Sequence, residues 1–114
     1  MSKPLHHHIV ARARQLISDR AHWTQGALAK RKNGLPVEPT DPDAYRYCAV
    51  GALTRAACEL TGKISDADVL ANEVHVALLM FSEIPANETL ECTNDFRQGH
   101  TAILKIFDDY LAAH

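Results

Sequence analysis

Apolar residues recur at every third or fourth position along most of this chain, and that spacing places them on one face of an α-helix. The first such stripe, in residues 5–21, consists of Leu5, Ile9, Ala13, Leu16 and Ile17. No run of alternating β-branched residues indicates a sheet. The sequence therefore predicts an all-α fold, a compact bundle of four to five helices.

Residues that begin or end helices set the expected boundaries. Gly62 is expected to end one helix, because glycine readily adopts the left-handed conformation of a C-cap. Ser65 and Asp95 have side-chain oxygens that cap helix N-termini. The last helix is expected to bury one face, formed by Phe96, His100, Ile103, Phe107 and Tyr110. The expected helices cover residues 5–21, 24–32 (a short one), 41–61, 65–84 and a last one from residue 95.

A segment with three prolines, residues 35–43, separates the short helix from the next long one. Proline fixes φ and disfavours a helical conformation for the residue before it, so we expect a long, stiff loop here. Asn33-Gly34 is expected to form a left-handed C-cap before this loop. Asp41 or Asp43 is expected to cap the helix after it.

The composition is that of one globular domain spanning residues 1–114, with 46% hydrophobic and 23% charged residues. No stretch approaches the roughly 20 apolar residues of a membrane helix, and the N-terminus lacks the apolar core of a signal peptide. Three cysteines at unrelated spacings, at positions 48, 58 and 92, fit reduced thiols better than disulfides. We therefore expect a cytoplasmic protein without membrane contact.

Charge is distributed unevenly along the chain. The first 34 residues carry seven bases and one acid, whereas the remaining 80 carry five bases and thirteen acids. The favoured interpretation is that the basic third faces the acidic remainder, within the fold or across a dimer. The alternative is nucleic-acid binding, because a basic patch attracts phosphates. The residues that would carry it are Arg12, Arg14, Lys30, Arg31 and Lys32.

A run of small residues, Cys48 to Leu53, contains the cysteine most suited to chemistry. A thiol near the start of a helix, with an imidazole close by, has the features of a nucleophile. In that hypothesis His100 is the general base, and Asp95 or Asn94 orients it. The competing interpretation makes Cys48 and His100 core residues and Asp95 a helix cap. Gly51, within the run, is expected to let another helix approach closely.

Two further groups of residues are of types that often bind ligands: an aromatic group and a run of three histidines. One hypothesis is that Trp23, Tyr45 and Tyr47 form a stacking or peptide-binding patch near the basic residues. The favoured interpretation is that the lone tryptophan anchors the core at the base of a loop. Consecutive histidines point in directions about 100° apart on a helix, whereas zinc ligands share one face. The run of His6, His7 and His8 therefore predicts no metal site, and we expect no cofactor.

The order of Trp23, Gly26-Ala27, the run from Cys48 to Leu53 and Asn94-Asp95 resembles a family of small bacterial and phage proteins, the domain-of-unknown-function family 6197. The resemblance covers residues 9–112. It implies a helical domain without an established activity and supplies no catalytic residues. The family usually has tryptophan before the Asn-Asp pair, whereas this chain has Thr93. The family pattern does not require a histidine at position 100, which weakens the Cys–His hypothesis.

The leading functional hypothesis is a non-enzymatic module that contacts a protein partner or a second copy of itself. The alternative is a small hydrolase or transferase that uses Cys48 and His100. Nucleic-acid binding by the basic third is the remaining hypothesis.

Overall fold

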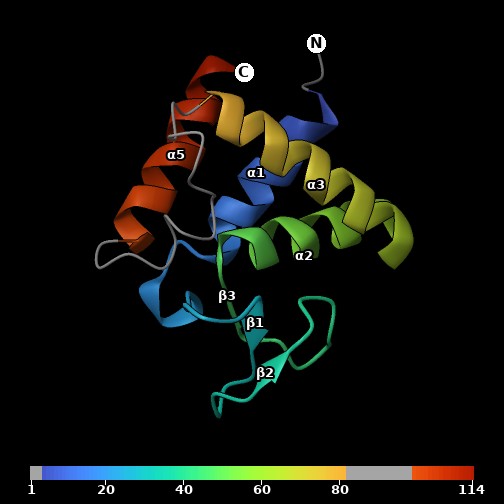
Figure 1. Ribbon diagram of the computed structural model, residues 1–114, viewed down its shortest axis with the longest axis vertical. Coiled ribbons are helices and arrows are strands. Elements are labelled where there is room, and N and C mark those ends of the chain that lie inside the picture. The colour runs from blue at the N-terminus through green and yellow to red at the C-terminus, as the bar shows by residue number, and fades with distance from the viewer. Residues whose placement is uncertain (1–3, 82–98) are drawn as a thin grey trace.

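Four α-helices contain most of the buried residues that the structure describes. A computed structural model describes residues 4–81 and 99–114. In Figure 1, α3 passes in front of α1 and lies beside α2, and α5 lies to the left of α1. The core includes Ile9 of α1, Leu53 of α2, Leu78 of α3 and Phe107 of α5, none of which is exposed. The helices are α1 (Leu5–Leu16), α2 (Ala49–Thr61), α3 (Ile64–Phe81) and α5 (Gly99–Ala113).

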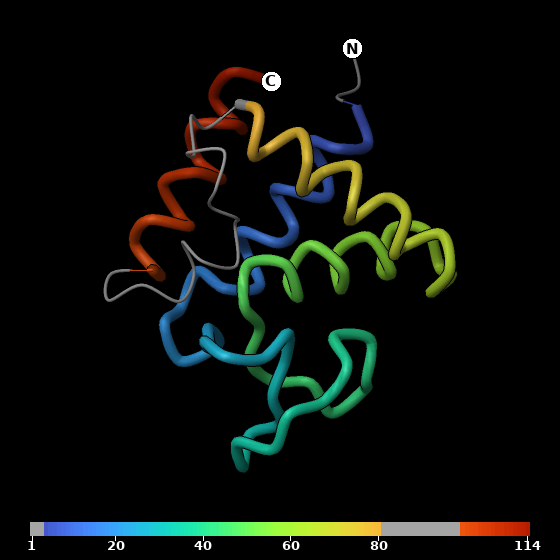
Figure 2. The backbone as a smooth tube through the Cα atoms, in the orientation of Figure 1, coloured from blue at the N-terminus to red at the C-terminus, as the bar shows by residue number. Residues whose placement is uncertain are grey.

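The segment between α1 and α2 forms a small antiparallel sheet, so the prediction of an all-α fold was only partly right. Its strands are β1 (Ala29–Lys30), β2 (Pro36–Val37) and β3 (Arg46–Tyr47), in the order β2-β1-β3. Figure 2 shows this segment as one excursion of the chain beyond α2. Strands of two residues are too short to show an alternating pattern in the sequence. Their pairing is made by backbone groups that are distant in the chain, which the sequence pattern does not reveal.

The sheet overturns the prediction of a short helix over residues 24–32. Asn33-Gly34 forms the turn between β1 and β2, where the Arg31 N–H donates to the Leu35 carbonyl at 2.8 Å. Gly34 does have a positive φ of 92°, but it serves a hairpin turn and not a helix C-cap. The expected loop of residues 35–43 likewise contains β2.

Helix α2 begins later than expected, because β3 keeps the chain extended up to Tyr47. Its N-cap is Cys48, not Asp41 or Asp43. The Asp41 carboxylate instead accepts the Asp43 N–H at 2.7 Å, within the preceding turn. The predicted C-terminal end is confirmed, since Gly62 caps α2 with a φ of 74°.

Two other helix boundaries also differ from the prediction. Helix α1 ends at Leu16 because Asp19 accepts the Ala21 N–H and starts the 3-10 turn η1 (Arg20–His22). Ser65 lies inside α3, which already begins at Ile64. The expected cap at Asp95, the expected burial of Phe96 and the end of α3 beyond residue 81 lie outside the described residues.

Ion pairs join the basic first third of the chain to the acidic remainder, which confirms that interpretation within the fold. Arg12 of α1 contacts Glu59 of α2 at 2.7 Å, and Arg14 of α1 contacts Asp108 of α5 at 2.9 Å. Arg31 lies 3.9 Å from the nearest carboxylate oxygens of the turn before β3. These pairs tie α1 to its neighbours and hold the sheet segment together.

Candidate functional site

Trp23 and Tyr47 meet where the sheet joins the helices. The two residues form a parallel backbone bridge, and the Thr24 N–H donates to the Tyr47 carbonyl at 3.1 Å. Both side chains are buried. Their burial agrees with the interpretation that they anchor the core. The Trp23 ring also packs against the His100 ring, with 5.3 Å between the ring centroids.

His100 joins the start of α5 to the end of α1. Its Nε2 lies 2.6 Å from the carbonyl oxygen of Ile17. A carbonyl only accepts hydrogen bonds, so Nε2 carries the proton and donates it. Ile17 is the C-cap residue of α1, where carbonyls lack partners within the helix. His100 thus satisfies a helix end, and only its Nδ1 is left to act as a base.

Cys48 is buried at the N-terminal end of α2. Its Sγ accepts the Gly51 N–H at 3.3 Å, and its own N–H donates to the Leu28 carbonyl at 3.1 Å. The positive end of a helix favours a thiolate, but the small exposed fraction of Cys48, 5%, restricts access to it. Cys48 and His100 thus each form hydrogen bonds with backbone groups that join neighbouring elements.

Gly51 lets the carbonyl of Leu28, the residue before β1, and not the helix that the sequence suggested, approach α2. A Cβ built on Gly51 would lie 1.8 Å from the Leu28 carbonyl oxygen. That same oxygen accepts the Cys48 N–H. The absence of a side chain at position 51 therefore lets Leu28 pack on the first turn of α2.

Tyr45 lies at the rim of a groove of about 310 Å³ between α1 and the turn before β3. Its ring packs against His22 at 4.5 Å between centroids, and His22 Nδ1 lies 3.0 Å from the Tyr45 carbonyl oxygen. Lys32 and Arg46 lie within 6 Å of the Tyr45 ring, at 5.8 and 5.5 Å. The groove is lined by Arg12, Gln15, Leu16, His22, Ala44, Tyr45 and Tyr47.

Tyr47 forms the inner wall of this groove. Its hydroxyl donates to the Ala44 carbonyl at 3.3 Å. Burial raises the pKa of the Tyr47 phenol above its ordinary value, and although Arg55 and Arg12 oppose the shift, burial prevails. Tyr47 therefore stays neutral near pH 7 and acts there as a hydrogen-bonding and packing residue.

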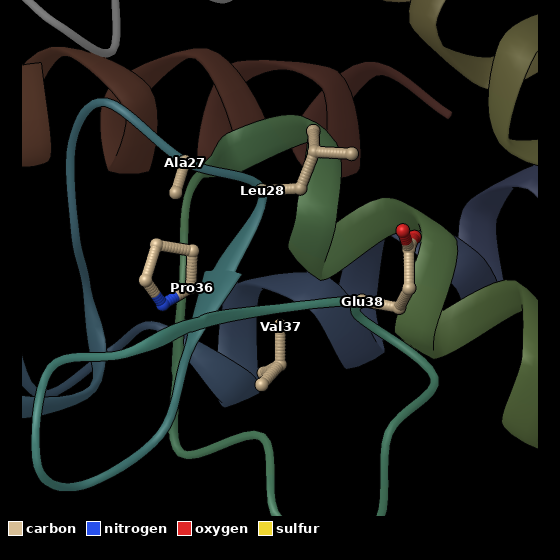
Figure 3. A pocket seen from close by; sticks show the side chains of 5 residues that line it. All are labelled: Ala27, Leu28, Pro36, Val37 and Glu38. Carbon is tan, nitrogen blue, oxygen red and sulfur yellow. The ribbon is translucent and has the colours of Figure 1, made fainter.

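A second hollow, of about 400 Å³, lies beside β2. Figure 3 shows its lining residues, Ala27, Leu28, Pro36, Val37 and Glu38. Four of these are apolar, and Glu38 supplies the one carboxylate. The hollow contains no residue of the kind that performs catalysis other than this carboxylate.

The structure brings together only part of the predicted site. Trp23 contacts both Tyr47 and His100, and Cys48 follows Tyr47 in the chain. Tyr45 faces the groove that Tyr47 also lines, beside His22 and Arg12. Asn94 and Asp95, the proposed orienting residues, lie outside the described residues.

His22 and Arg46 were not identified from the sequence as candidate site residues. Arg46 donates to the carbonyls of Ala21 and Lys32, at 3.1 and 3.3 Å, and lies beside Tyr45. The only available signal was the basic and aromatic character of the sequence around Tyr45. That signal does not reveal which distant residues the β1–β3 pairing brings alongside.

Within residues 4–81 and 99–114, no three His, Cys, Asp or Glu side chains are grouped to hold a metal ion. His6, His7 and His8 lie in the first turns of α1, and His6 reaches Glu73 of α3 at 3.4 Å. In the same part of the chain, no helix combines the length and apolar character needed to cross a membrane.

Comparison with known proteins finds one family. The family model that matches residues 1–111 is described as a family of unknown function, DUF6197. No curated protein and no solved structure matches the chain.

Proposed function

The chain belongs to the DUF6197 family, and from its own geometry we propose that it is a non-enzymatic interaction module that self-associates through α3. The observation that carries this proposal is a second apolar stripe on α3, opposite the buried one. The buried stripe consists of Ala67, Ala71, Val74 and Leu78.

The second stripe, called here the outer stripe of α3, consists of Val69, Val76 and Met80. Their exposed fractions are 60%, 47% and 82%. Spacings of seven and four residues place all three on one side of the helix. A helix that only covers a core has polar residues on its outer side, and single exposed apolar residues are common. Three exposed apolar residues on one side of a single helix, with Glu73 among them, instead indicate a surface that a partner covers.

The charges beside the outer stripe favour a second copy as that partner. Glu73 lies between Val69 and Val76 on the same face, and its carboxylate is 3.4 Å from His6 of α1. A two-fold interface must be complementary to itself, and this surface supplies both an acid and a base. A two-fold axis near the middle of the stripe places Val69 of one copy against Met80 of the other.

The test is the oligomeric state of the full chain, measured by sedimentation at protein concentrations from about 1 µM to 1 mM. We expect reversible dimers, with a Kd in the micromolar range or above because the stripe is small. Val76→Glu should weaken the dimer more than about tenfold, since it buries an unpaired charge. Leu35→Glu, at an equally exposed site on the β1–β2 turn, is the matched control and should leave the dimer unchanged.

Two results would contradict this proposal. A wild-type chain that is monomeric across the whole concentration range does not self-associate. A dimer that survives Val76→Glu but is lost in Leu35→Glu uses the small sheet and not α3.

The alternative is a hydrolase or transferase that uses Cys48 and His100. The position of Cys48 at the N-terminal end of α2 supports it, because the helix dipole favours the thiolate nucleophile. It ranks second because the Nε2 of His100 donates to the Ile17 carbonyl and the thiol is buried. Thiol reactivity separates the two functions, as described in the Discussion.

A further inference from the structure

We propose that the solvent face of the small sheet binds a short acidic peptide segment of a partner protein. Three cations form the site, and they are called here the Tyr45 cluster. Lys32 and Arg46 lie within 6 Å of the Tyr45 ring, and Lys30 is the strand partner of Arg46. This surface lies on a different element from the outer stripe of α3. The inference therefore goes beyond the proposed self-association and does not depend on it.

The β1–β3 pairing places two like charges directly opposite each other. Lys30 pairs with Arg46, and the neighbouring pair, Ala29 and Tyr47, is buried. Directly opposite residues share one face of a sheet, so Lys30 and Arg46 both point to the solvent side. Like charges in such a pair destabilise a sheet unless an anion lies between them. A bound carboxylate would convert this repulsion into attraction.

The cations of the Tyr45 cluster differ from several arginines elsewhere in the chain in lacking an acidic partner among the residues that the structure describes. Arg12, Arg14, Arg31 and Arg55 each have an acidic partner within 4 Å. In the described part of the chain, the Tyr45 cluster has none. Arg46 donates to two backbone carbonyls, which fix its guanidinium in place without neutralising it. The cluster is therefore a positioned, uncompensated positive charge.

Tyr45 adds an apolar contact to this charge. Its ring lies next to Lys32 and Arg46 on the cluster and next to His22 at the groove. The adjoining groove of about 310 Å³ contains Leu16, Ala44 and Tyr47. A peptide with acidic residues beside an apolar one matches this pairing of a cationic surface with a groove whose lining includes apolar and aromatic side chains.

The size of the site favours a short peptide over a nucleic acid. The whole chain has a net charge of −2, and residues 35–114 carry thirteen acids. The molecule measures 38 × 33 × 24 Å, whereas charges are screened beyond about 10 Å at 0.1 M salt. A short acidic segment contacts the cluster alone, whereas a long polyanion extends over the acidic parts of the surface and is repelled there.

The experiment measures binding of fluorescent hexaglutamate to the full chain by anisotropy, at about 50 mM salt. Lys30→Gln combined with Lys32→Gln should weaken binding about fivefold, because two charge contacts are lost. The matched control combines Lys63→Gln with Lys105→Gln, which removes the same charge from α5 and the α2–α3 turn. That control should bind as the wild type does. Denaturant unfolding of both variants shows that they are folded.

Three results would overturn the proposal. The first is no binding of hexaglutamate at this salt concentration. The second is an equal loss in the two double variants, which would mean that only net charge matters. The third is tighter binding of a single-stranded oligonucleotide with the same dependence on Lys30 and Lys32, which would assign the surface to nucleic acid. Sedimentation without peptide reports the α3 dimer separately, so either proposal can fail alone.

Discussion

Gly51 is the residue whose missing side chain allows the backbone of Leu28, just before β1, to pack against α2. In an exposed helix position, alanine would be about 1 kcal/mol more favourable than glycine. Here the Leu28 carbonyl occupies the space of a Cβ. In a Gly51→Ala variant, the helix propensity of alanine would stabilise the protein, whereas the clash of its Cβ would destabilise it. A clash with backbone cannot be relieved by rotating a side chain.

Gly51→Ala should therefore lower the free energy of unfolding by about 3 kcal/mol, because the backbone of β1 or α2 must shift. Chemical denaturation measures this change. Gly62→Ala is the comparison, since its Cβ meets no atom within 4 Å but its φ is 74°. That substitution should cost only about 1 kcal/mol, from the left-handed backbone. A stabilised Gly51→Ala variant would show that Leu28 does not pack against α2 as described.

The reactivity of the Cys48 thiol distinguishes between an interaction module and an enzyme. Its thiol is buried and accepts the Gly51 N–H, whereas Cys58 is only half-buried. We expect an alkylating reagent to modify Cys58 before Cys48 in the folded chain, and Cys48 only on unfolding. Peptide mass spectrometry across pH 5–9 measures both rates. Fast modification of Cys48 at pH 6 that slows in His100→Ala would instead establish a thiolate–imidazole site.

At the scale of elements, Glu59 links α1 to α2. Its carboxylate accepts hydrogen bonds from Arg12 of α1, at 2.7 Å, and from Arg55 of its own helix, at 3.2 Å. The hydrogen bond from Arg12 is the largest cause that lowers the pKa of Glu59, with partial burial opposing it and Arg55 adding to it. Arg55 also donates to the carbonyls of Pro39 and Asp41, so the same network holds the turn before β3.

A carboxyl group whose pKa is lowered by folding stabilises the protein above its unfolded pKa, near 4.3. This stabilisation is lost as the pH falls through the lower folded pKa. Glu59→Gln should therefore destabilise the protein at pH 7 by about 0.5–1 kcal/mol, since the pair is partly exposed. The difference from wild type should shrink below about pH 4.

Denaturant unfolding at several pH values tests the role of Glu59. Asp109→Asn is the control, because Asp109 pairs with Lys105 within one exposed turn of α5 and should change stability little at any pH. A difference between Glu59→Gln and wild type that stays constant from pH 7 to pH 3 would contradict a lowered pKa.

For the whole molecule, attraction between the basic first third and the acidic remainder contributes to stability. The Arg12–Glu59 and Arg14–Asp108 pairs both join these parts and are partly exposed. Salt screens such pairs. Raising sodium chloride from about 0.05 to 1 M should therefore lower the free energy of unfolding by about 1 kcal/mol.

Thermal or urea unfolding at several salt concentrations measures this dependence. Asp108→Asn removes one of the pairs and should reduce the slope against salt. Stability that rises steadily with salt, in wild type and variant alike, would mean that repulsion within each part outweighs the attraction between them.

The helices were predictable because their signals are local. Ile9 and Ala13 of α1, and Ile103, Phe107 and Tyr110 of α5, are buried as their spacing indicates. Gly62 ends α2 as its conformational freedom suggests. The start of α2 was not predictable from Asp41 and Asp43, because the pairing of β3 with β1 overrides their local capping preference.

The candidate site was predictable only as a set of residue types. The sequence indicated that Trp23, Tyr45 and Tyr47 belong together. The structure places Trp23 and Tyr47 at a buried junction, and Tyr45 at the rim of a groove that Tyr47 also lines. The sequence also suggested chemistry between Cys48 and His100, whereas each side chain is engaged with backbone groups that no local pattern identifies.

The sequence by itself determined a mostly helical fold with a basic first third and an acidic remainder, because periodicity and charge are properties of neighbouring residues. Only the tertiary structure decided that Lys30 lies opposite Arg46, that Leu28 contacts Gly51 and that α3 leaves a second apolar stripe exposed. Those facts depend on hydrogen bonds and packing between residues far apart in the chain, which leave no repeating pattern in the sequence.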